Sequence, residues 1–285
     1  LSCGSNQLTS LPILPSSLTD LECYFNQITS LPALPSSLIT LVCGGNLLTT
    51  LPTLPSSLIT LKCYSNQLTF LPTLPSALSY LDCGSNLISS LPALPSSLTY
   101  LDCRLNQITS LPTLTGSIQF LDCSNNLLSI LPALPGSLAS LICSSNSLVD
   151  LPSLPSSLSY LDCSNATLDS LPVSMNSVTE LYCQNNLLTT LPLLSPSIYT
   201  LICSNNNINC FEEFPSTLFW IDISNNPFTC LPNYIPVMDA TILLYPLCIT
   251  GDLINNPYGC TGAEGVVGYT YTDMNTNCMK DTLDG

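Results

Sequence analysis

Apolar and polar positions along the chain repeat every 20 residues, from Leu1 to about Ala240. A period of this length is typical of stacked units that contact only their neighbours, so the chain is expected to form one elongated domain of about twelve units. In the second unit, the apolar positions are Leu21, Cys23, Ile28, Leu31, Leu34 and Leu38.

Two segments of each unit predict different backbone conformations. Leu21 and Cys23 alternate with polar residues, which indicates a short strand with both apolar side chains inward. Pro32 and Pro35 follow, and prolines at this spacing prevent a regular helix and favour an extended backbone. The expected fold is a mainly β solenoid with parallel strands on a concave face, an extended, polyproline-like convex side and no regular α-helices.

A fixed asparagine follows each predicted strand, as Asn26 does. Its side-chain amide can bond backbone groups of its own turn and of the neighbouring turn. Repeat nine departs from this rule, because Ala166 occupies the asparagine position and Asn165 comes one place early. We therefore expect a ladder of asparagines with a local irregularity at Ala166.

The repeat sequence Leu-Pro-x-Leu-Pro-Ser-Ser-Leu resembles the short, 20-residue bacterial class of leucine-rich repeat. The cysteine variant, Leu-Asp-Cys-Ser-Asn-Asn at 121–126, is similar to surface proteins of the Bacteroidetes. The resemblance covers residues 1 to about 240 and implies a secreted or cell-surface protein. Such repeats serve adhesion and simple spacing alike, so the likeness is specific for fold and not for function.

The end of the chain leaves the repeat pattern. We expect a solenoid over 1–232 and a C-terminal cap over 233–262, since a solenoid needs a cap on its last open face. The alternating run from Val266 to Thr272 resembles the opening of a B-type immunoglobulin-like module. Residues 263–285 would then begin a following module of a longer chain, with a disordered tail as the alternative.

Charge excludes several classes of partner and activity. The formal charge is −15, and Lys62, Arg104 and Lys280 are the only cations. Nucleic acid is excluded because it requires rows of Lys or Arg, and no apolar run is long enough for direct membrane insertion. There is no His, and no Ser or Cys lies beside a candidate base, so we expect no enzyme. Cations such as calcium are the natural counter-charge.

The sixteen cysteines form two groups. Eleven occupy the third position of successive repeats, from Cys3 to Cys203. Stacked strands hold their Cβ atoms about 4.8 Å apart, against about 3.8 Å in a disulfide, so we expect buried free thiols. A metal–thiolate column is the disfavoured alternative, because thiols stacked on one side lack tetrahedral geometry.

The other five cysteines lie in the cap and the tail, where chain ends need fastening. In an oxidising compartment we expect Cys230 to pair with Cys248 and Cys260 to pair with Cys278, which leaves Cys210 over. A Cys210–Cys230 bond is the rival, because these two occupy equivalent positions of adjacent repeats.

The residues that flank each strand's buried leucine point onto the concave face. There, aromatic side chains lie beside carboxylates and form a candidate surface for a protein or a glycan. The candidate ligand-binding residues are Tyr80, Asp82, Tyr100, Asp102, Phe120, Asp122, Tyr160 and Asp162. Two alternatives remain: the aromatic residues simply favour strands, or the solenoid is a structural spacer or packing unit of a long surface or filament protein.

The tail carries a candidate calcium loop. Its oxygen ligands alternate in a manner that suits calcium's 6–8 coordination, although Cys278 stands where such loops carry glycine. A polar, frayed terminus is the alternative. The candidate ligands are Asp273, Asn275, Asn277, Asp281 and Asp284.

Overall fold

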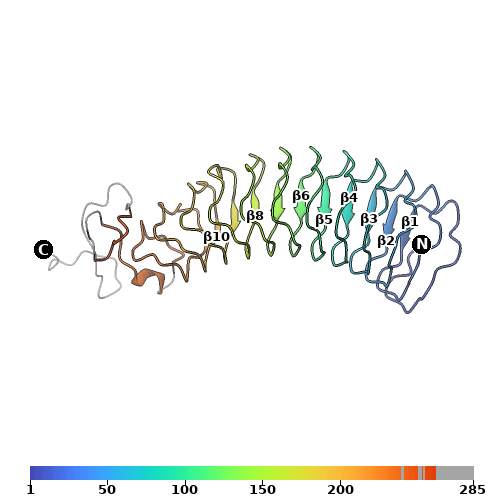
Figure 1. The fold of residues 1–285 in the computed structure, drawn as a ribbon, viewed down its shortest axis with the longest axis horizontal. Coiled ribbons are helices and arrows are strands. Elements are labelled where there is room, and N and C mark those ends of the chain that lie inside the picture. Colours follow the sequence, from blue (N-terminus) through green and yellow to red (C-terminus); the bar gives the residue numbers. More distant parts are fainter. Residues whose placement is uncertain (239–240, 250–251, 253, 261–285) are drawn as a thin grey trace.

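The chain forms a long, gently curved solenoid in the computed structural model, which describes residues 1–238, 241–249, 252 and 254–260 (Figure 1). Its strands form one 11-stranded sheet whose order in space follows the sequence from β1 to β11. Every pairing is parallel, and each residue faces its equivalent 20 positions later, as Leu101 faces Leu121. The predicted mainly β solenoid is therefore confirmed.

The strands are three residues long, and each lies at the same point of its repeat. They are β1 (Asp20–Glu22), β2 (Thr40–Val42), β3 (Thr60–Lys62), β4 (Tyr80–Asp82), β5 (Tyr100–Asp102), β6 (Phe120–Asp122), β7 (Ser140–Ile142), β8 (Tyr160–Asp162), β9 (Glu180–Tyr182), β10 (Thr200–Ile202) and β11 (Trp220–Asp222). The described part contains no α-helix and one 3-10 turn, η1 (Ile242–Leu244).

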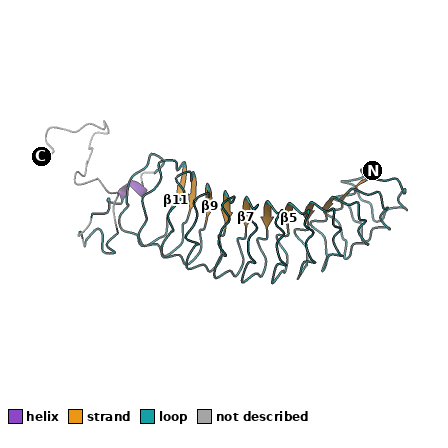
Figure 2. Ribbon diagram, turned by 90° about the horizontal axis from the view of Figure 1, so that it is seen from above, coloured by secondary structure: helices purple, strands orange, loops and turns teal. Residues whose placement is uncertain are grey.

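The sheet lines the concave side of the molecule, and the proline-rich return segments form the outer side (Figure 2). Curvature in this direction follows from the repeat, because the extended return segment occupies more width than a strand. The central residue of most strands is fully buried, as Leu101 is, while its two neighbours point outward onto the concave face.

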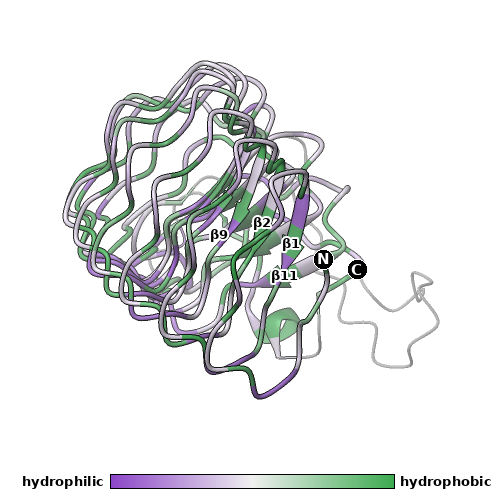
Figure 3. Ribbon diagram, turned by 90° about the vertical axis from the view of Figure 1, so that its right-hand side faces the viewer, coloured by the Kyte–Doolittle hydropathy of each residue, from purple (hydrophilic) through white to green (hydrophobic). Residues whose placement is uncertain are grey.

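One continuous apolar core runs through the coils, which superimpose when the molecule is viewed along its length (Figure 3). Leucines fill it together with the cysteines from Cys23 to Cys203, and these cysteines have no exposed surface. All eleven repeat cysteines are free thiols, as the strand spacing predicts. Near the C-terminal end the aromatic residues Phe211 and Phe214 both replace leucines of the repeat and are also buried.

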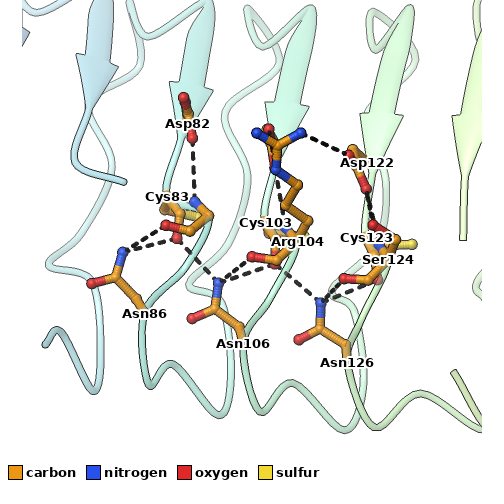
Figure 4. A network of polar contacts seen from close by, with 12 residues as sticks. Asp82, Cys83, Asn86, Cys103, Arg104, Asn106, Asp122, Cys123, Ser124 and Asn126 are labelled. Carbon is orange, nitrogen blue, oxygen red and sulfur yellow. Dashed lines mark hydrogen bonds and ion pairs between the residues drawn. The ribbon is translucent and has the colours of Figure 1, made fainter. Parts of the chain in front are cut away.

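The asparagine ladder holds neighbouring turns together (Figure 4). Nδ2 of Asn106 donates to the carbonyl oxygen of Cys103 at 3.0 Å and to that of Cys83, one repeat earlier, at 3.1 Å. Its Oδ1 accepts from the backbone N–H of Ile88 at 3.0 Å. A single buried amide thus satisfies backbone groups that the narrow turn would otherwise leave unpaired.

Repeat nine keeps its strand and the turn that follows it, and loses these bonds. Strand β8 pairs with β9 in the regular register, and Asn165 adopts the same left-handed turn conformation as its equivalents. Ala166 has no amide, so within the described residues nothing replaces the bond that Leu148 N–H would donate. The expected irregularity therefore consists of lost hydrogen bonds at Ala166 and of backbone bends at Val173 and Thr179 in the return segment.

The residue before the asparagine position adopts a positive φ in the described repeats, with values of 49° to 66° from Ser5 to Asn225. Asparagine and glycine tolerate this conformation best. Gly45 also has a second reason to be glycine, because a Cβ atom there would lie 2.3 Å from the ring of Phe25.

Two disulfides fasten the C-terminal end of the solenoid. Cys230 pairs with Cys248, as expected. Cys260 pairs with Cys210, so the predicted Cys260–Cys278 bond and the rival Cys210–Cys230 bond are both wrong. The reason is that Cys260 lies against repeat eleven, where its Sγ is also 3.4 Å from the carbonyl oxygen of Asn209.

The proposed calcium ligands, the start of an immunoglobulin-like module and Cys278 all fall within residues 261–285, outside the described residues. They remain predictions from the sequence.

Candidate functional site

The candidate site is the middle of the concave face, and the structure brings most of its predicted residues together there. Strand register places Tyr80, Tyr100 and Phe120 side by side on β4 to β6, and it aligns Asp82, Asp102 and Asp122 beside them. Tyr160 and Asp162 lie on β8, one strand beyond β7. We call Tyr80, Tyr100, Phe120 and Tyr160 the aromatic column, and Asp82, Asp102, Asp122 and Asp162 the acidic column.

The first three rings of the aromatic column form a continuous stack. The centroids of Tyr80 and Tyr100 are 4.1 Å apart at an interplanar angle of 5°, and those of Tyr100 and Phe120 are 4.4 Å apart at 2°. These distances match the strand spacing of about 4.8 Å, narrowed by the concave curvature. The sheet thus holds three rings as a rigid row, half-buried against one another.

A lysine side chain lies over the ring at one end of this stack. Nζ of Lys62, from β3, lies 4.9 Å from the ring centroid of Tyr80, within the range of a cation–π contact. Lys62 was not among the residues predicted for the site, although its position one repeat before Asp82 signals this contact.

At the other end, the column is interrupted. Ser140 of β7 stands between Phe120 and Tyr160 in the register. Beyond it, Tyr160 packs against Tyr182 with centroids 5.4 Å apart. Tyr182 in turn donates to Glu180, as does Tyr199. Tyr182 was not predicted to belong to the site, because it lies in the same column as the aspartates.

The acidic column has a structural role that the sequence analysis missed. In Asp122, Oδ1 accepts from the backbone N–H of Ser124 at 3.0 Å and from its hydroxyl at 2.6 Å. Ser164 bonds Asp162 in the same way, at 3.0 and 2.7 Å. Each aspartate therefore stabilises the turn that leaves its strand. The signal in the sequence is the repeated Asp-Cys-Ser.

Arg104 joins two members of the acidic column (Figure 4). Its Nε lies 3.5 Å from Oδ2 of Asp102, and its Nη1 lies 3.7 Å from Oδ2 of Asp122 on the next strand. Both aspartates are only 3% exposed, while the arginine side chain is 54% exposed and lies over them. Asp102 and Asp122 were predicted to contact a ligand directly, and their burial under Arg104 does not favour that role.

Burial shifts the titration of this region. It raises the pKa of Asp102 from 3.8 to about 6, because desolvation of the carboxylate outweighs the backbone hydrogen bond from Arg104. Desolvation also raises the pKa of Asp82. The pKa of Tyr160 rises to about 12, through desolvation and then the nearby charge of Asp162. The phenol of Tyr160 therefore stays neutral at pH 7, and the charge of Asp102 changes as the pH passes through about 6.

The cysteines that the structure describes offer neither a nucleophile nor a metal site in this state. Desolvation raises the pKa of the Cys23 thiol to about 12 and that of Cys103 well above its ordinary value. Cys230, Cys248 and Cys260 lie close enough to share a metal ion, but all three are in disulfides.

The described part of the chain contains no helix with the length and apolar character that a membrane span requires.

Comparison with known proteins finds the same architecture in bacterial proteins. YopM from Yersinia enterocolitica WA-314 is 40% identical with a TM-score of 0.81, over 82% of this chain and 52% of that one. YopM from Yersinia pestis, a leucine-rich effector protein, is 31% identical with a TM-score of 0.64, over 82% and 79%. InlJ from Listeria monocytogenes, whose functional domain includes a cysteine ladder, is 25% identical with a TM-score of 0.64, over 84% and 61%.

These likenesses settle the family and leave the partner open. No protein-family model matches the sequence, and no curated protein matches it significantly. The chain spans about half the length of the Y. enterocolitica YopM structure, so that protein's activity does not transfer to it. The Y. pestis protein is matched over most of both chains at more than 30% identity. The chain therefore belongs to the leucine-rich repeat family.

Proposed function

We propose that the chain is a non-catalytic, extracellular binding module that recognises a protein through the aromatic column of its concave sheet. The observation that carries this proposal is the row of three parallel rings, Tyr80, Tyr100 and Phe120, on the side of the sheet away from the core. Tyrosine is enriched among the residues that dominate binding energy at protein interfaces. Rings already fixed by stacking lose little conformational freedom when a partner docks.

The acidic column sets the electrostatic character of this surface. Asp102 and Asp122 act through Arg104 and through the turns that they stabilise, while Asp82 and Asp162 are less deeply buried. With a formal charge of −15, the chain attracts partners with a basic surface and repels acidic ones. A basic protein partner therefore fits the surface better than a neutral glycan does.

Two disulfides at the C-terminal end support an oxidising, extracellular location. The same compartment suits a binding module that is displayed at, or released from, a cell surface. Detection of both bonds in protein isolated from its source under thiol-blocking conditions tests the location. Isolation of the chain with all four cysteines reduced would overturn it.

Site-specific photo-crosslinking tests the binding surface. A photoreactive benzoylphenylalanine replaces Tyr80 at the end of the stack in one variant and Val173 in the other; Val173 is 89% exposed on the outer side. The proposal expects a discrete protein adduct from position 80 that Phe120→Ser suppresses, and none from position 173. Adducts from position 173 alone, or a glycan-array signal that Phe120→Ser leaves unchanged, would overturn it. No adduct from either position would favour the spacer function.

A further inference from the structure

The interruption of the aromatic column at Ser140 is the most specific feature of the concave face. On either side of it lie Phe120 and Tyr160, two strands apart in the register. Phe120 is stacked on Tyr100, and Tyr160 packs against Tyr182, so each ring has its packed partner on the side away from Ser140. Two ring spacings of the size found in this column, 4.1 and 4.4 Å, amount to about 8.5 Å. A planar group packed on both faces requires about 7 to 8 Å, because carbon atoms in contact lie about 3.5 to 4.0 Å apart. The interval over Ser140 therefore matches the thickness of one planar group.

The charges beside the interruption differ from those elsewhere in the column. Asp122 and Asp162 have the same hydrogen bonds to Ser124 and Ser164, both through Oδ1. Oδ2 of Asp122 has Arg104 at 3.7 Å. Oδ2 of Asp162 has no cation within ion-pair distance in the described part of the chain. Asp122 thus forms an ion pair with an arginine of this chain, whereas Asp162, the equivalent residue two strands away, forms none within the described residues.

The chain also shows which chemistry its concave face accepts. Lys62 covers the ring of Tyr80, and Arg104 spans carboxylates on neighbouring strands. A guanidinium group combines both contacts, since it stacks on aromatic faces and pairs with carboxylates through a planar fork. A lysine ammonium is a point charge without flat faces, so it cannot pack against two aromatic rings at once as a guanidinium group can.

We propose that an arginine of the protein partner inserts over Ser140, with its guanidinium plane between the rings of Phe120 and Tyr160 and its N–H groups donating to Oδ2 of Asp162. This inference rests on the proposed function and adds the chemistry of the contact. Ile142, which lies between Asp122 and Asp162 in the register, would line the stem of the inserted side chain.

A capped tripeptide, acetyl-Gly-Arg-Gly-amide, serves as the probe, with methyl NMR of Ile142 as the readout. We expect a saturable shift of the Ile142 methyl signal with a dissociation constant on the order of 1 mM. The lysine peptide and the neutral citrulline peptide should bind at least about 5-fold more weakly, because one lacks the plane and the other lacks the charge.

Three variants locate the contact. Ser140→Tyr fills the interruption and should abolish the shift, while Ser140→Ala leaves it open and should bind as the wild type does. Asp162→Asn keeps an oxygen for Ser164 and should weaken binding at least about 5-fold. Thr40→Tyr, a new ring in the same column at β2, is the matched control for an added tyrosine and should leave the shift unchanged.

Equal binding of the arginine and lysine peptides, or an unchanged shift in Ser140→Tyr, would overturn the inference. If photo-crosslinking from position 80 succeeds while the arginine peptide does not bind, the inference fails and the proposed function stands. If crosslinking comes from position 173 alone, the proposed function fails whatever the peptide does.

Discussion

Nη1 of Arg104 lies 3.7 Å from Oδ2 of Asp122, a carboxylate on the next strand that is only 3% exposed. With its contact to Asp102, this pairing makes a single arginine the counter-ion for two buried carboxylates. In a chain with three cations in total, that placement decides the electrostatics of the whole concave face.

Replacing Arg104 with glutamine should destabilise the solenoid. The two buried carboxylates lose their shared cation, and we expect the free energy of unfolding to fall by about 1–2 kcal/mol at pH 7, since the half-exposed arginine is partly screened by water. Urea unfolding measures the change, with Lys62→Gln as the control that touches no carboxylate pair. The loss should shrink at pH 5, where Asp102 is largely protonated; an equal loss at both pH values would contradict this explanation.

Asp102 should make stability depend on pH. Its folded pKa, about 6, lies above its ordinary value of 3.8 because of burial. Its contribution is therefore fully present below pH 3.8 and is lost as the pH rises through about 6. Asp102→Asn removes this loss, so the variant should gain on the order of 2 kcal/mol relative to wild type between pH 4 and pH 7.

Unfolding curves at both pH values test this, with the exposed Asp169→Asn as the control. A difference between Asp102→Asn and wild type that does not vary with pH would show that the carboxylate titrates normally.

The asparagine ladder can be tested by both loss and gain. Asn126→Ala removes a buried amide that bonds Cys103, Cys123 and Ile108, and should cost about 2–3 kcal/mol. Ala166→Asn should restore the missing rung and stabilise the protein by about 1 kcal/mol. Thermal unfolding of the two variants measures the effects. Destabilisation by Ala166→Asn would mean that repeat nine is built around alanine.

The repeat cysteines should resist alkylation in the native state. Burial raises the pKa of Cys23 and Cys103 and hides the sulfur atoms from Cys23 to Cys203, so among the repeat cysteines iodoacetamide at pH 8 should first modify the half-exposed Cys3. After mild reduction, Cys210, Cys230, Cys248 and Cys260 should become reactive, because reduction breaks the bonds that fasten the C-terminal end of the solenoid and keep these thiols covered. Peptide mass spectrometry reads each site. Rapid native labelling of Cys103 would contradict the packed core.

The sequence predicts the solenoid well because the same pattern of apolar and polar positions recurs in successive repeats. The positions of Leu21, Cys23 and Asn26 recur, so strand, core and ladder follow from one unit. The Cys210–Cys260 bond was not predictable in this way, since it depends on how an irregular segment folds back over 50 residues. The repeat pattern does not predict which earlier residue Cys260 contacts.

The candidate site was predictable in position and less so in chemistry. Strand alternation placed Tyr100 and Asp102 on the concave face, which the structure shows. Alternation does not reveal that Arg104 lies over Asp102, because Arg104 follows the strand and its side chain returns across two strands. The contact of Lys62 with the ring of Tyr80 also depends on where a long side chain extends, which strand alternation does not reveal.

The central claim is that the stacked rings of the concave face bind a protein partner. Its most direct test is the dissociation constant of the partner identified by crosslinking, measured for wild type, for Tyr100→Ser with Phe120→Ser, and for the outer-face pair Ile13→Ser with Val173→Ser. Loss of two interface aromatic residues should weaken binding by about 100-fold or more, while the outer-face pair should bind as wild type does. Equal affinity of the concave variant and wild type would contradict the claim.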